Sequence, residues 1–297
     1  MQDIVLKTQG LTKAYGDFKA LDGLDLTLHK GEVLGYLGPN GAGKTTTIRL
    51  LLGLIKPTAG RATLFGLDVQ KEKVEVHKHL AYVPGEAALW PNLTGLETLN
   101  LLSNIHGSVD ERYRKELIDR FELDVHKKVR AYSKGNKQKI NLIAALASRA
   151  ELLVLDEPTS GLDPLMEQVF RECVAEAKRN GQTVFLSSHI LGEVEALCDR
   201  VAILRAGKLV EVGTLEEMRH LSAVTVTATF KTEPPKLGKL AGVSNVHISG
   251  HELTCQVQGP IDELLSVLAK AKPVTLLSRE PSLEELFLAL YGEQEVK

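Results

Sequence analysis

A glycine-rich segment that joins a strand-like run to a helix-like run constrains the fold of this 297-residue chain more than any other feature. The apolar run EVLGYL at 32–37 leads into GPNGAGKTT at 38–46, and a helical pattern follows at once. Glycine lets the backbone wrap so tightly that successive N–H groups converge on an anion, and the following helix adds the positive end of its dipole. The segment therefore predicts a phosphate-binding loop formed by Gly38, Pro39, Asn40, Gly41, Ala42, Gly43, Lys44, Thr45 and Thr46.

Three side chains of this loop have the chemistry that a bound nucleoside triphosphate requires. Lys44 can neutralise the outer phosphates, Thr45 offers a hydroxyl oxygen to Mg²⁺, and Thr46 can bond to an inner phosphate oxygen. A purely structural glycine-rich turn is the alternative, and the order of strand, loop and helix disfavours it.

An acidic pair at the end of a later apolar run supplies the carboxylates that such a loop needs. In LLVLDEP at 152–158, Asp156 stands at the carboxyl end of a predicted buried strand, where ligands of open α/β sheets collect. We expect Asp156 to hold the magnesium shell. Because side chains alternate along a strand, Glu157 should point elsewhere, where it could take a proton from attacking water. Two solvated acids at a strand end are the alternative, which the phosphate loop upstream disfavours.

Strand-like and helix-like runs alternate from residue 4 to about residue 213, as in ELLVLD, VFRECVAEAKRNG and TVFLSS. This alternation predicts an α/β domain with a mainly parallel, buried sheet. Helical patterns such as TGLETLNLLSNIHG and VDERYRKELIDRFEL dominate between about 77 and 150. We therefore expect a domain at 1–215 with a helical subdomain, about 77–150, inserted in its α/β core.

The pattern changes after Gly213. VTVTATF, VSNVHIS, ELTCQVQ and VTLLS read as strands, IDELLSVLAKA as an amphipathic helix, and PSLEELFLALYG, with Pro281 at its start, as a second helix. Their order predicts a small α+β domain at 216–297, helices on an antiparallel sheet, with a ferredoxin-like arrangement.

A lysine-rich segment, YSKGNKQK at 132–139, allows three interpretations: a basic finger for nucleic acid, a solvated helix start, or half of a binding site. The chain has 36 Lys and Arg against 38 Asp and Glu, and this net charge of -2 provides no overall field that would hold a polyanion. We therefore expect no nucleic-acid partner. The helical pattern that follows makes Ser133 a good N-cap, with the positive end of the helix dipole beside it.

The N-terminus, the hydropathy and the cysteines predict a cytosolic protein. MQDIVLKTQGLTK lacks the basic start and the apolar stretch of a secretory signal. No run approaches the ~18 apolar residues that cross a bilayer, so we expect no direct membrane insertion. The three cysteines form no CxxC motif, and we expect buried apolar roles for Cys173, Cys198 and Cys255.

Taken in order, these motifs resemble the ATP-binding subunits of ABC transporters over residues 3–213. The resemblance implies a P-loop NTPase fold, ATP and Mg²⁺ as ligands, and ATP hydrolysis coupled to transmembrane transport. The family's LSGGQ-like signature corresponds to YSKGN at 132–136, where Ser133 and Gly135 match and Tyr132, Lys134 and Asn136 depart. In the family this signature binds the γ-phosphate of ATP on the opposite subunit. The resemblance thus favours half of a composite nucleotide site for the lysine-rich segment.

Three further positions take their roles from the resemblance. Asp163 in SGLD resembles the polar contact of a loop that crosses the dimer interface, with an ordinary turn as the alternative. His189 in FLSSHI resembles the histidine that contacts the γ-phosphate and the attacking water, with a helix cap as the alternative. Tyr15 in LTKAYGDFKAL resembles the aromatic that stacks on adenine. Phe18 competes with it, and a buried sheet aromatic is the alternative for both.

One position departs from the family. Where YVPQ is usual, this chain has YVPG, with Gly85 in the glutamine's place and Glu86 beside it. That glutamine normally reaches magnesium or the attacking water. We expect Glu86 to reach the metal shell in the closed dimer, with water in the gap as the alternative.

The resemblance also implies partners. Two copies, or one copy and a paralogous subunit, would trap ATP between them, and the region around Trp90 would dock a separately encoded membrane permease; a buried structural tryptophan is the rival there. The protein would lie on the cytoplasmic face of the membrane through that permease. The C-terminal module resembles the extra domain of drug, antibiotic or polysaccharide exporters, so export is the expected direction. A soluble ATP-dependent switch, or a sensor without useful turnover, is the alternative function.

Overall fold

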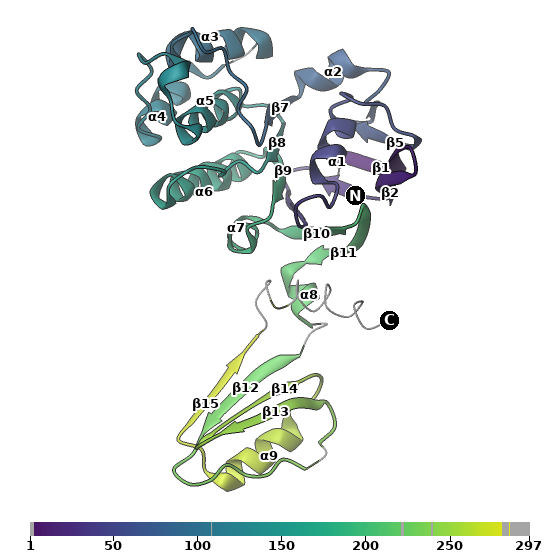
Figure 1. The fold of residues 1–297 in the computed structure, drawn as a ribbon, viewed down its shortest axis with the longest axis vertical. Helices are drawn as coiled ribbons and strands as arrows, with labels where there is room; N and C mark the ends of the chain where they lie inside the picture. The colour runs from purple at the N-terminus through teal and green to yellow at the C-terminus, as the bar shows by residue number, and fades with distance from the viewer. Residues whose placement is uncertain (1–2, 108, 221–222, 239, 281–284, 286–297) are drawn as a thin grey trace. The chain divides into compact units, whose positions relative to one another are not determined.

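The computed structural model describes residues 3–107, 109–220, 223–238, 240–280 and 285. The chain divides into two compact units, Met1–Gly213 and Thr214–Lys297 (Figure 1). Two clusters of buried apolar side chains lie in the first unit, and a separate cluster lies in the second. Each unit therefore has a hydrophobic core of its own, the main physical requirement of a domain.

A six-stranded sheet in the order β11-β10-β4-β9-β8-β7 forms the centre of the first unit. Its strands are β4 (Val33–Leu37), β7 (Leu80–Val83), β8 (Leu152–Asp156), β9 (Thr183–Ser188), β10 (Arg200–Arg205) and β11 (Lys208–Thr214). All neighbours from β10 to β7 run parallel. The strands β4, β8 and β9 are buried along their whole length, as a parallel sheet covered on both faces requires. The predicted α/β fold is confirmed.

Alternate residues of this sheet enter two different cores. Leu152 and Val154 of β8 pack in one apolar cluster, and Leu153 and Leu155 pack in the other. The first cluster includes side chains of α1 and the second includes side chains of α5 and α6, so these helices cover opposite faces. These helices are α1 (Lys44–Leu51), α5 (Lys134–Ala147) and α6 (Pro164–Arg179), and a further short helix, α7 (Leu191–Leu197), follows β9.

A second, antiparallel sheet in the first unit was not separated by the sequence analysis. Its order is β2-β1-β5-β6, with β3 paired to β1. A sequence pattern indicates that a run is a strand but not which strands pair with it, and only the pairing separates the two sheets. The strands are β1 (Ile4–Tyr15), β2 (Phe18–Leu24), β3 (Thr27–His29), β5 (Ala59–Leu64) and β6 (Leu67–Asp68), and α2 (Lys73–Lys78) follows.

The helical part of the first unit comprises α3 (Gly95–His106), α4 (Glu111–Arg120), the 3₁₀ turn η1 (Val129–Ala131) and α5. The helix α3 begins with a capping box, in which Thr94 and Glu97 satisfy each other's backbone N–H groups. The strand β7 lies inside the range 77–150 that we predicted as helical, yet it pairs in parallel with β8. The helical part therefore begins after Val83. The predicted range included β7 because a strand of four residues gives no periodicity that separates it from a helix.

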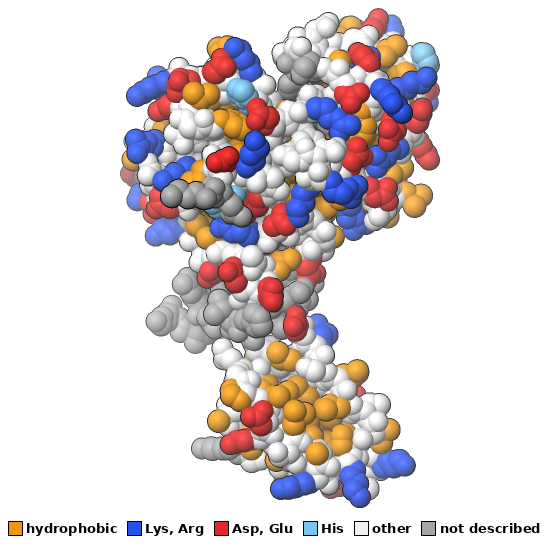
Figure 2. Space-filling model, turned by 180° about the vertical axis from the view of Figure 1, so that it is seen from behind, with side chains coloured by type: hydrophobic (Ala, Val, Ile, Leu, Met, Phe, Trp, Pro, Cys, Tyr) orange, Lys and Arg blue, Asp and Glu red, His pale blue; other side chains and the backbone are white. Residues whose placement is uncertain are grey.

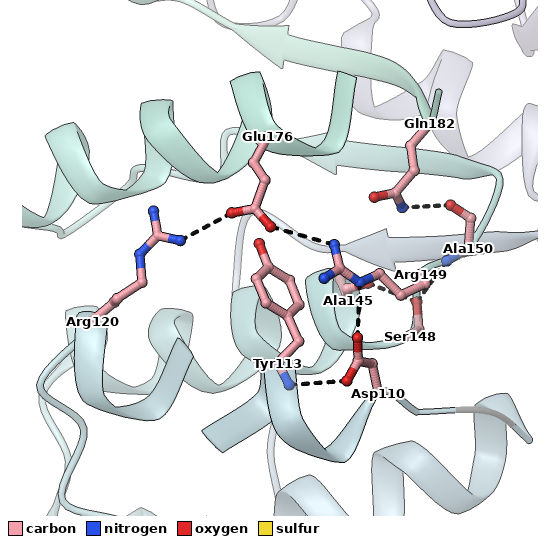
Figure 3. Close-up of polar contacts among 9 residues, drawn as sticks. All are labelled: Asp110, Tyr113, Arg120, Ala145, Ser148, Arg149, Ala150, Glu176 and Gln182. Carbon is pink, nitrogen blue, oxygen red and sulfur yellow. Dashed lines mark hydrogen bonds and ion pairs between the residues drawn. The ribbon is translucent and has the colours of Figure 1, made fainter. Parts of the chain in front are cut away.

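Polar contacts join this helical part to α6 (Figure 3). The carboxylate of Glu176 on α6 accepts from Nη1 of Arg120 at 3.1 Å and lies 3.6 Å from Nη1 of Arg149. Arg149 also lies over the ring of Tyr113 at 3.5 Å, and its Nε donates to Asp110 at 3.4 Å. One carboxylate thus meets two guanidinium groups, one from α4 and one from the chain that follows α5.

The second unit holds a four-stranded antiparallel sheet in the order β13-β14-β12-β15, which is the ferredoxin-like order. Leu264 and Leu268 of α9 pack against Val226 and Leu253 of the sheet. The helix predicted at 281–292 lies outside the described residues, except for Glu285. The elements are α8 (Leu215–His220), β12 (Val224–Thr229), β13 (Val243–Ser249), β14 (Glu252–Val257), α9 (Asp262–Ala271) and β15 (Thr275–Arg279).

No helix in the described part of the chain combines the length and the apolar character needed to cross a bilayer. The cysteines are free thiols, of which Cys173 and Cys255 are buried and Cys198 is partly buried. Desolvation raises the pKa of each thiol, as expected for cysteines that act as small apolar side chains.

Candidate functional site

The glycine-rich loop turns directly from β4 into α1. Gly41 and Gly43 have φ values of 80° and 112°, in the left-handed region that favours glycine. A Cβ on Gly43 would lie 2.5 Å from the carbonyl oxygen of Ala20, and a Cβ on Gly38 would lie 2.5 Å from that of Leu204. The loop can therefore close against the neighbouring backbone only with glycine at these positions.

Lys44, the first residue of α1, is buried inside the loop. Its Nζ donates to the carbonyl oxygens of Gly38 at 2.7 Å and Pro39 at 3.2 Å. The same atom lies 3.5 Å from Oε1 of Glu157. Because burying an unpaired cation is costly, this carboxylate and these carbonyls hold the ammonium group at the loop.

A cavity of about 350 Å³ opens over the loop. Tyr15 and Phe18 pair across the hairpin of β1 and β2, and both line the cavity. Tyr15 is 52% exposed and Phe18 is 65% exposed, so neither is the buried sheet aromatic that we weighed as an alternative. Both rings are available for stacking on a base. The other lining residues are Ala20, Pro39, Asn40, Gly41, Gly43, Lys44, Thr45, Thr46 and Glu157.

Asp156 ends β8 with its carboxylate buried beside the loop. Its Oδ1 accepts from Oγ of Ser187, the residue paired with it on β9, at 2.9 Å. Desolvation raises the pKa of Asp156, while hydrogen bonds from Ser187 and Thr45 act in the opposite direction. A carboxylate next to a hydroxyl is the hard oxygen donor set that Mg²⁺ prefers. The residues present thus fit the ion.

Glu157 points away from Asp156 for a reason other than the predicted one. The strand ends at Asp156, and Glu157 has a left-handed φ of 47°, so a turn rather than strand alternation redirects its side chain. Its Oε1 lies 3.5 Å from Nζ of Lys44 and 3.3 Å from Nδ1 of His189. A non-glycine residue in this region costs about 1–3 kcal/mol, and such strain tends to occur at functional sites.

His189 directly follows β9 and is half exposed. The N-cap of α7 is Ile190, with no side-chain cap, so the helix-cap alternative for His189 is wrong. The imidazole of His189 and the ammonium group of Lys44 lie 3.3 Å and 3.5 Å from the same oxygen of Glu157, Oε1. The structure brings together Lys44 and two residues that lie more than a hundred positions later in the sequence.

Ser133 and Gly135 lie at the start of α5, away from the cavity lining just described. Ser133 is the N-cap, and its Oγ accepts from the backbone N–H of Asn136 at 3.2 Å. Gly135 packs so closely on the SGLD loop that a Cβ would overlap the carbonyl oxygen of Gly161. Lys134 reaches the same loop, where its Nζ donates to Oγ of Ser160 at 2.7 Å. The two segments thus contact each other within one chain.

Asp163 has a local structural role in this structure. It is the N-cap of α6, and its Oδ1 accepts from the N–H of Met166 at 3.0 Å. This is the turn before a helix that we weighed as the alternative. The side chain is nevertheless exposed, so a contact across an interface stays a prediction.

Gly85 lies beside the acidic pair, and Glu86 lies on the surface. A Cβ on Gly85 would lie 3.1 Å from the carbonyl oxygen of Asp156, a tight contact that favours a small residue at this position. The side chain of Glu86 is exposed, and its approach to a metal stays a prediction.

Sequence reasoning missed Ser187, which fixes the carboxylate of Asp156. The signal lies within FLSSHI, but only the parallel register of β8 and β9 places this serine opposite Asp156. A hydroxyl at a strand end has no recognisable role until the neighbouring strand is known.

The motifs that form this site match those of one known family. A family model described as ABC transporter matches residues 21–160. A linearmycin resistance ATP-binding protein of Bacillus subtilis is 34% identical over 97% of this chain and 98% of its own length. The chain belongs to the family of ABC transporter ATP-binding proteins. As such it is an ATPase subunit that powers transport.

Other ABC proteins agree with this assignment. A bacitracin transport ATP-binding protein of Bacillus licheniformis is 41% identical over 70% of this chain and 69% of its own length. A solved ATP-binding subunit of an ABC transporter is 31% identical, with a TM-score of 0.68 over 73% of this chain and 92% of that chain. A solved dimeric bacterial ABC transporter cassette has the same fold at 23% identity and a TM-score of 0.65, over 71% of this chain and 98% of that one.

Proposed function

We propose that this ABC subunit hydrolyses ATP for an exporter, in pairs, with the residues of the cavity and of the α5 start forming one composite site. The position of Glu157 carries the proposal, because its carboxylate lies between Lys44 and His189 at a cavity lined by the phosphate loop. Phosphoryl transfer asks a protein mainly for positioning and charge stabilisation, and this arrangement supplies both.

Each group of the cavity has one role in the proposed reaction. The adenine of ATP stacks on Tyr15, with Phe18 beside it, and the loop from Gly38 to Thr46 holds the phosphates. Thr45 and Asp156 would hold Mg²⁺, which neutralises phosphate charge when bound. Glu157 accepts a proton from attacking water, as a general base must lie within reach of the proton it removes. His189 holds the carboxylate of Glu157 and meets the product phosphate.

The pairing of subunits is supported by the separation of the two half-sites. Ser133 and Gly135 are absent from the lining of the cavity, although both are described residues. Ser133 is exposed at the N-terminus of a 14-residue helix, where backbone N–H groups and the dipole favour an anion. A second chain would bring this end to the γ-phosphate. Because one chain holds both half-sites, two copies suffice to build two sites; pairing with a paralogue would do the same.

A membrane permease is the proposed partner of the helical part. Trp90 precedes α3 and is 45% exposed, so the buried structural role weighed for it is wrong. An exposed tryptophan suits an interface, where its large ring gains most from burial. Two of the relatives that align along nearly the full chain are named as linearmycin and daunorubicin resistance ATP-binding proteins, which supports export. The protein would then lie on the cytoplasmic face of the membrane. On the face drawn in Figure 2, positive and negative side chains intermingle over the first unit.

ATPase activity of the full chain tests this proposal. We expect slow magnesium-dependent turnover that Glu157→Gln abolishes, together with an ATP-dependent dimer of that variant in gel filtration, because ATP that is not hydrolysed keeps the halves closed. Ser133→Ala is expected to weaken this dimer without weakening ATP binding to the monomer. Binding of ATP by an inactive wild-type chain would instead support the sensor function, for which Gly85 in the usual glutamine position is the motivating observation.

A further inference from the structure

Glu193 is a buried acid to which the proposed reaction gives no role. It lies in the first turn of α7 and is only 6% exposed. Its Oε2 accepts a short hydrogen bond from Oγ of Ser188 at 2.6 Å. Desolvation raises the pKa of Glu193, and the hydroxyls of Ser188 and Thr159 act in the opposite direction. A carboxylate is costly to bury, so a position of this kind has to be accounted for.

The hydrogen bond to Glu193 decides what the Ser188 hydroxyl can do. A hydroxyl has one proton and two acceptor lone pairs. Because the proton points to Glu193, the lone pairs of Ser188 are left to accept the backbone N–H of Ile190 at 3.0 Å. The bond from Ile190 closes a tight turn whose middle residue is His189, and the bond to Glu193 joins Ser188 to the first turn of α7.

This turn sets where the imidazole lies. Nδ1 of His189 is 3.3 Å from Oε1 of Glu157. The side chain itself is half exposed, so packing alone does not hold it there, and the backbone of the turn provides the constraint. A change in that backbone would move the imidazole relative to Glu157.

Glu193 also borders the turn that follows Glu157. Thr159 and Glu193 line one small cavity of about 170 Å³, together with Glu167 and Arg171. The turn itself is closed by the N–H of Ser160, which donates to the carbonyl oxygen of Glu157 at 3.1 Å. Glu193 thus borders both the segment that carries Glu157 and the segment that carries His189.

We propose that Glu193 is a positioning residue for ATP hydrolysis: by orienting the hydroxyl of Ser188, its carboxylate fixes the turn that holds His189 against Glu157. The inference rests on the roles proposed above for Glu157 and His189. A Glu193 that only anchored α7 would affect stability and leave the turn and the chemistry unchanged.

Three variants separate these roles. Glu193→Ala removes the acceptor for Ser188, whereas Glu193→Gln keeps an amide oxygen that can accept the same bond without the charge. Glu167→Ala is the matched control, since it removes an acid from the same cavity without touching Ser188. All are made in the full chain, and thermal melting identifies the folded variants.

Amide hydrogen exchange measures the turn without any need for turnover. We expect faster exchange at Ile190 and its neighbours in Glu193→Ala, because a Ser188 hydroxyl that is free to rotate holds the Ile190 N–H less well. Glu193→Gln and Glu167→Ala are expected to keep the wild-type rate. Unchanged exchange in Glu193→Ala overturns the inference, as does uniform acceleration through the whole first unit, which would indicate a structural role only.

Steady-state ATPase assays measure the chemistry. Misplacing a reacting group by about 1 Å can cost about a hundredfold, so we expect kcat of Glu193→Ala to fall about tenfold to a hundredfold with little change in KM for ATP, and Glu193→Gln to recover most of it. If the wild type is active and Glu193→Ala is equally active, the positioning role of Glu193 is refuted, while the proposed ATPase function stands. A wild-type chain without ATPase activity would count against the proposed function. The exchange experiment would still show whether Glu193 fixes the turn from Ser188 to Ile190.

Discussion

The buried carboxylate of Asp156 serves the chemistry at a cost to folding. Its pKa is raised by desolvation, so the ionised form is less favourable in the folded chain than in the unfolded chain. For a group with a raised folded pKa, the contribution to stability is complete at pH below the unfolded pKa and is lost as the pH rises through the folded pKa. At neutral pH, the charge therefore opposes folding until a cation compensates it.

Asp156→Asn is expected to melt at the same or a higher temperature than the wild type at neutral pH without nucleotide, because the amide oxygen can still accept from Ser187 and carries no charge. The difference should shrink as the pH falls through the raised pKa, where the wild-type carboxyl is also neutral. Magnesium-dependent ATPase activity should be lost. Thermal melts across pH check the first two outcomes; a variant that melts well below the wild type at neutral pH would contradict them.

Gly135 is constrained by its neighbour rather than by its φ. We expect Gly135→Ala to lower the free energy of unfolding by about 1–3 kcal/mol, since the new methyl group would overlap the carbonyl oxygen of Gly161 and force the two segments apart. Gly192→Ala is the matched control, because Gly192 lies in a helix with nothing within 4 Å of its Cβ position. Urea unfolding measures both. A neutral Gly135→Ala, or an equal loss in the control, would contradict this contact.

The single residues of the site differ in how far sequence could place them. The loop from Gly38 to Thr46 and the acid pair are continuous in sequence, so local pattern was enough to propose their chemistry. Ser187 and Glu193 act through neighbours on another strand or another turn, and no local pattern marks them. The direction of Glu157 was predicted, but the left-handed backbone that produces it was not.

At the scale of elements, α6 joins the helical part of the first unit through Glu176 (Figure 3). Because Glu176 meets two arginines and its side chain is only 26% exposed, its removal leaves partly buried guanidinium groups without this partner. Partly buried ionic contacts of this kind are worth more than exposed pairs.

We expect Glu176→Ala to lower the free energy of unfolding by about 1–3 kcal/mol. The control is Glu172→Ala, one turn earlier on α6, whose carboxylate is 56% exposed and 3.7 Å from Arg120; its loss should stay within about 0.5 kcal/mol. Chemical denaturation with both variants checks the ratio. Similar small losses for both would show that the network is merely a surface feature.

Element prediction succeeded where length and periodicity were unambiguous. The long helices α5 and α6 and the buried strands β8 and β9 lie where the pattern placed them. The four-residue β7 was absorbed into the helical range, and the antiparallel sheet was not separated from the parallel one. Strand partners depend on contacts that are distant in sequence, which a local pattern does not contain.

At the scale of the whole molecule, the two units have separate apolar cores, so the first should fold without the second. A chain that ends at Leu215, and so keeps all of β11, is expected to unfold cooperatively and to bind ATP with an affinity close to that of the full chain. Calorimetric melting and nucleotide titration measure these properties. A shortened chain that is unfolded or does not bind ATP would show that the second unit is part of the nucleotide-binding fold.

The contact of Gly135 and Lys134 with the SGLD loop has a consequence for timing. In the proposed pair, the start of α5 contacts the nucleotide bound to the partner. The SGLD loop, which α5 contacts, comes shortly after Glu157, the proposed general base of the chain's own site, in the sequence. We therefore expect the departure of phosphate from one cavity to affect the other cavity through this contact. The two hydrolysis events of a pair should be correlated, with a Hill coefficient for ATP above one that declines when Lys134 is shortened to alanine.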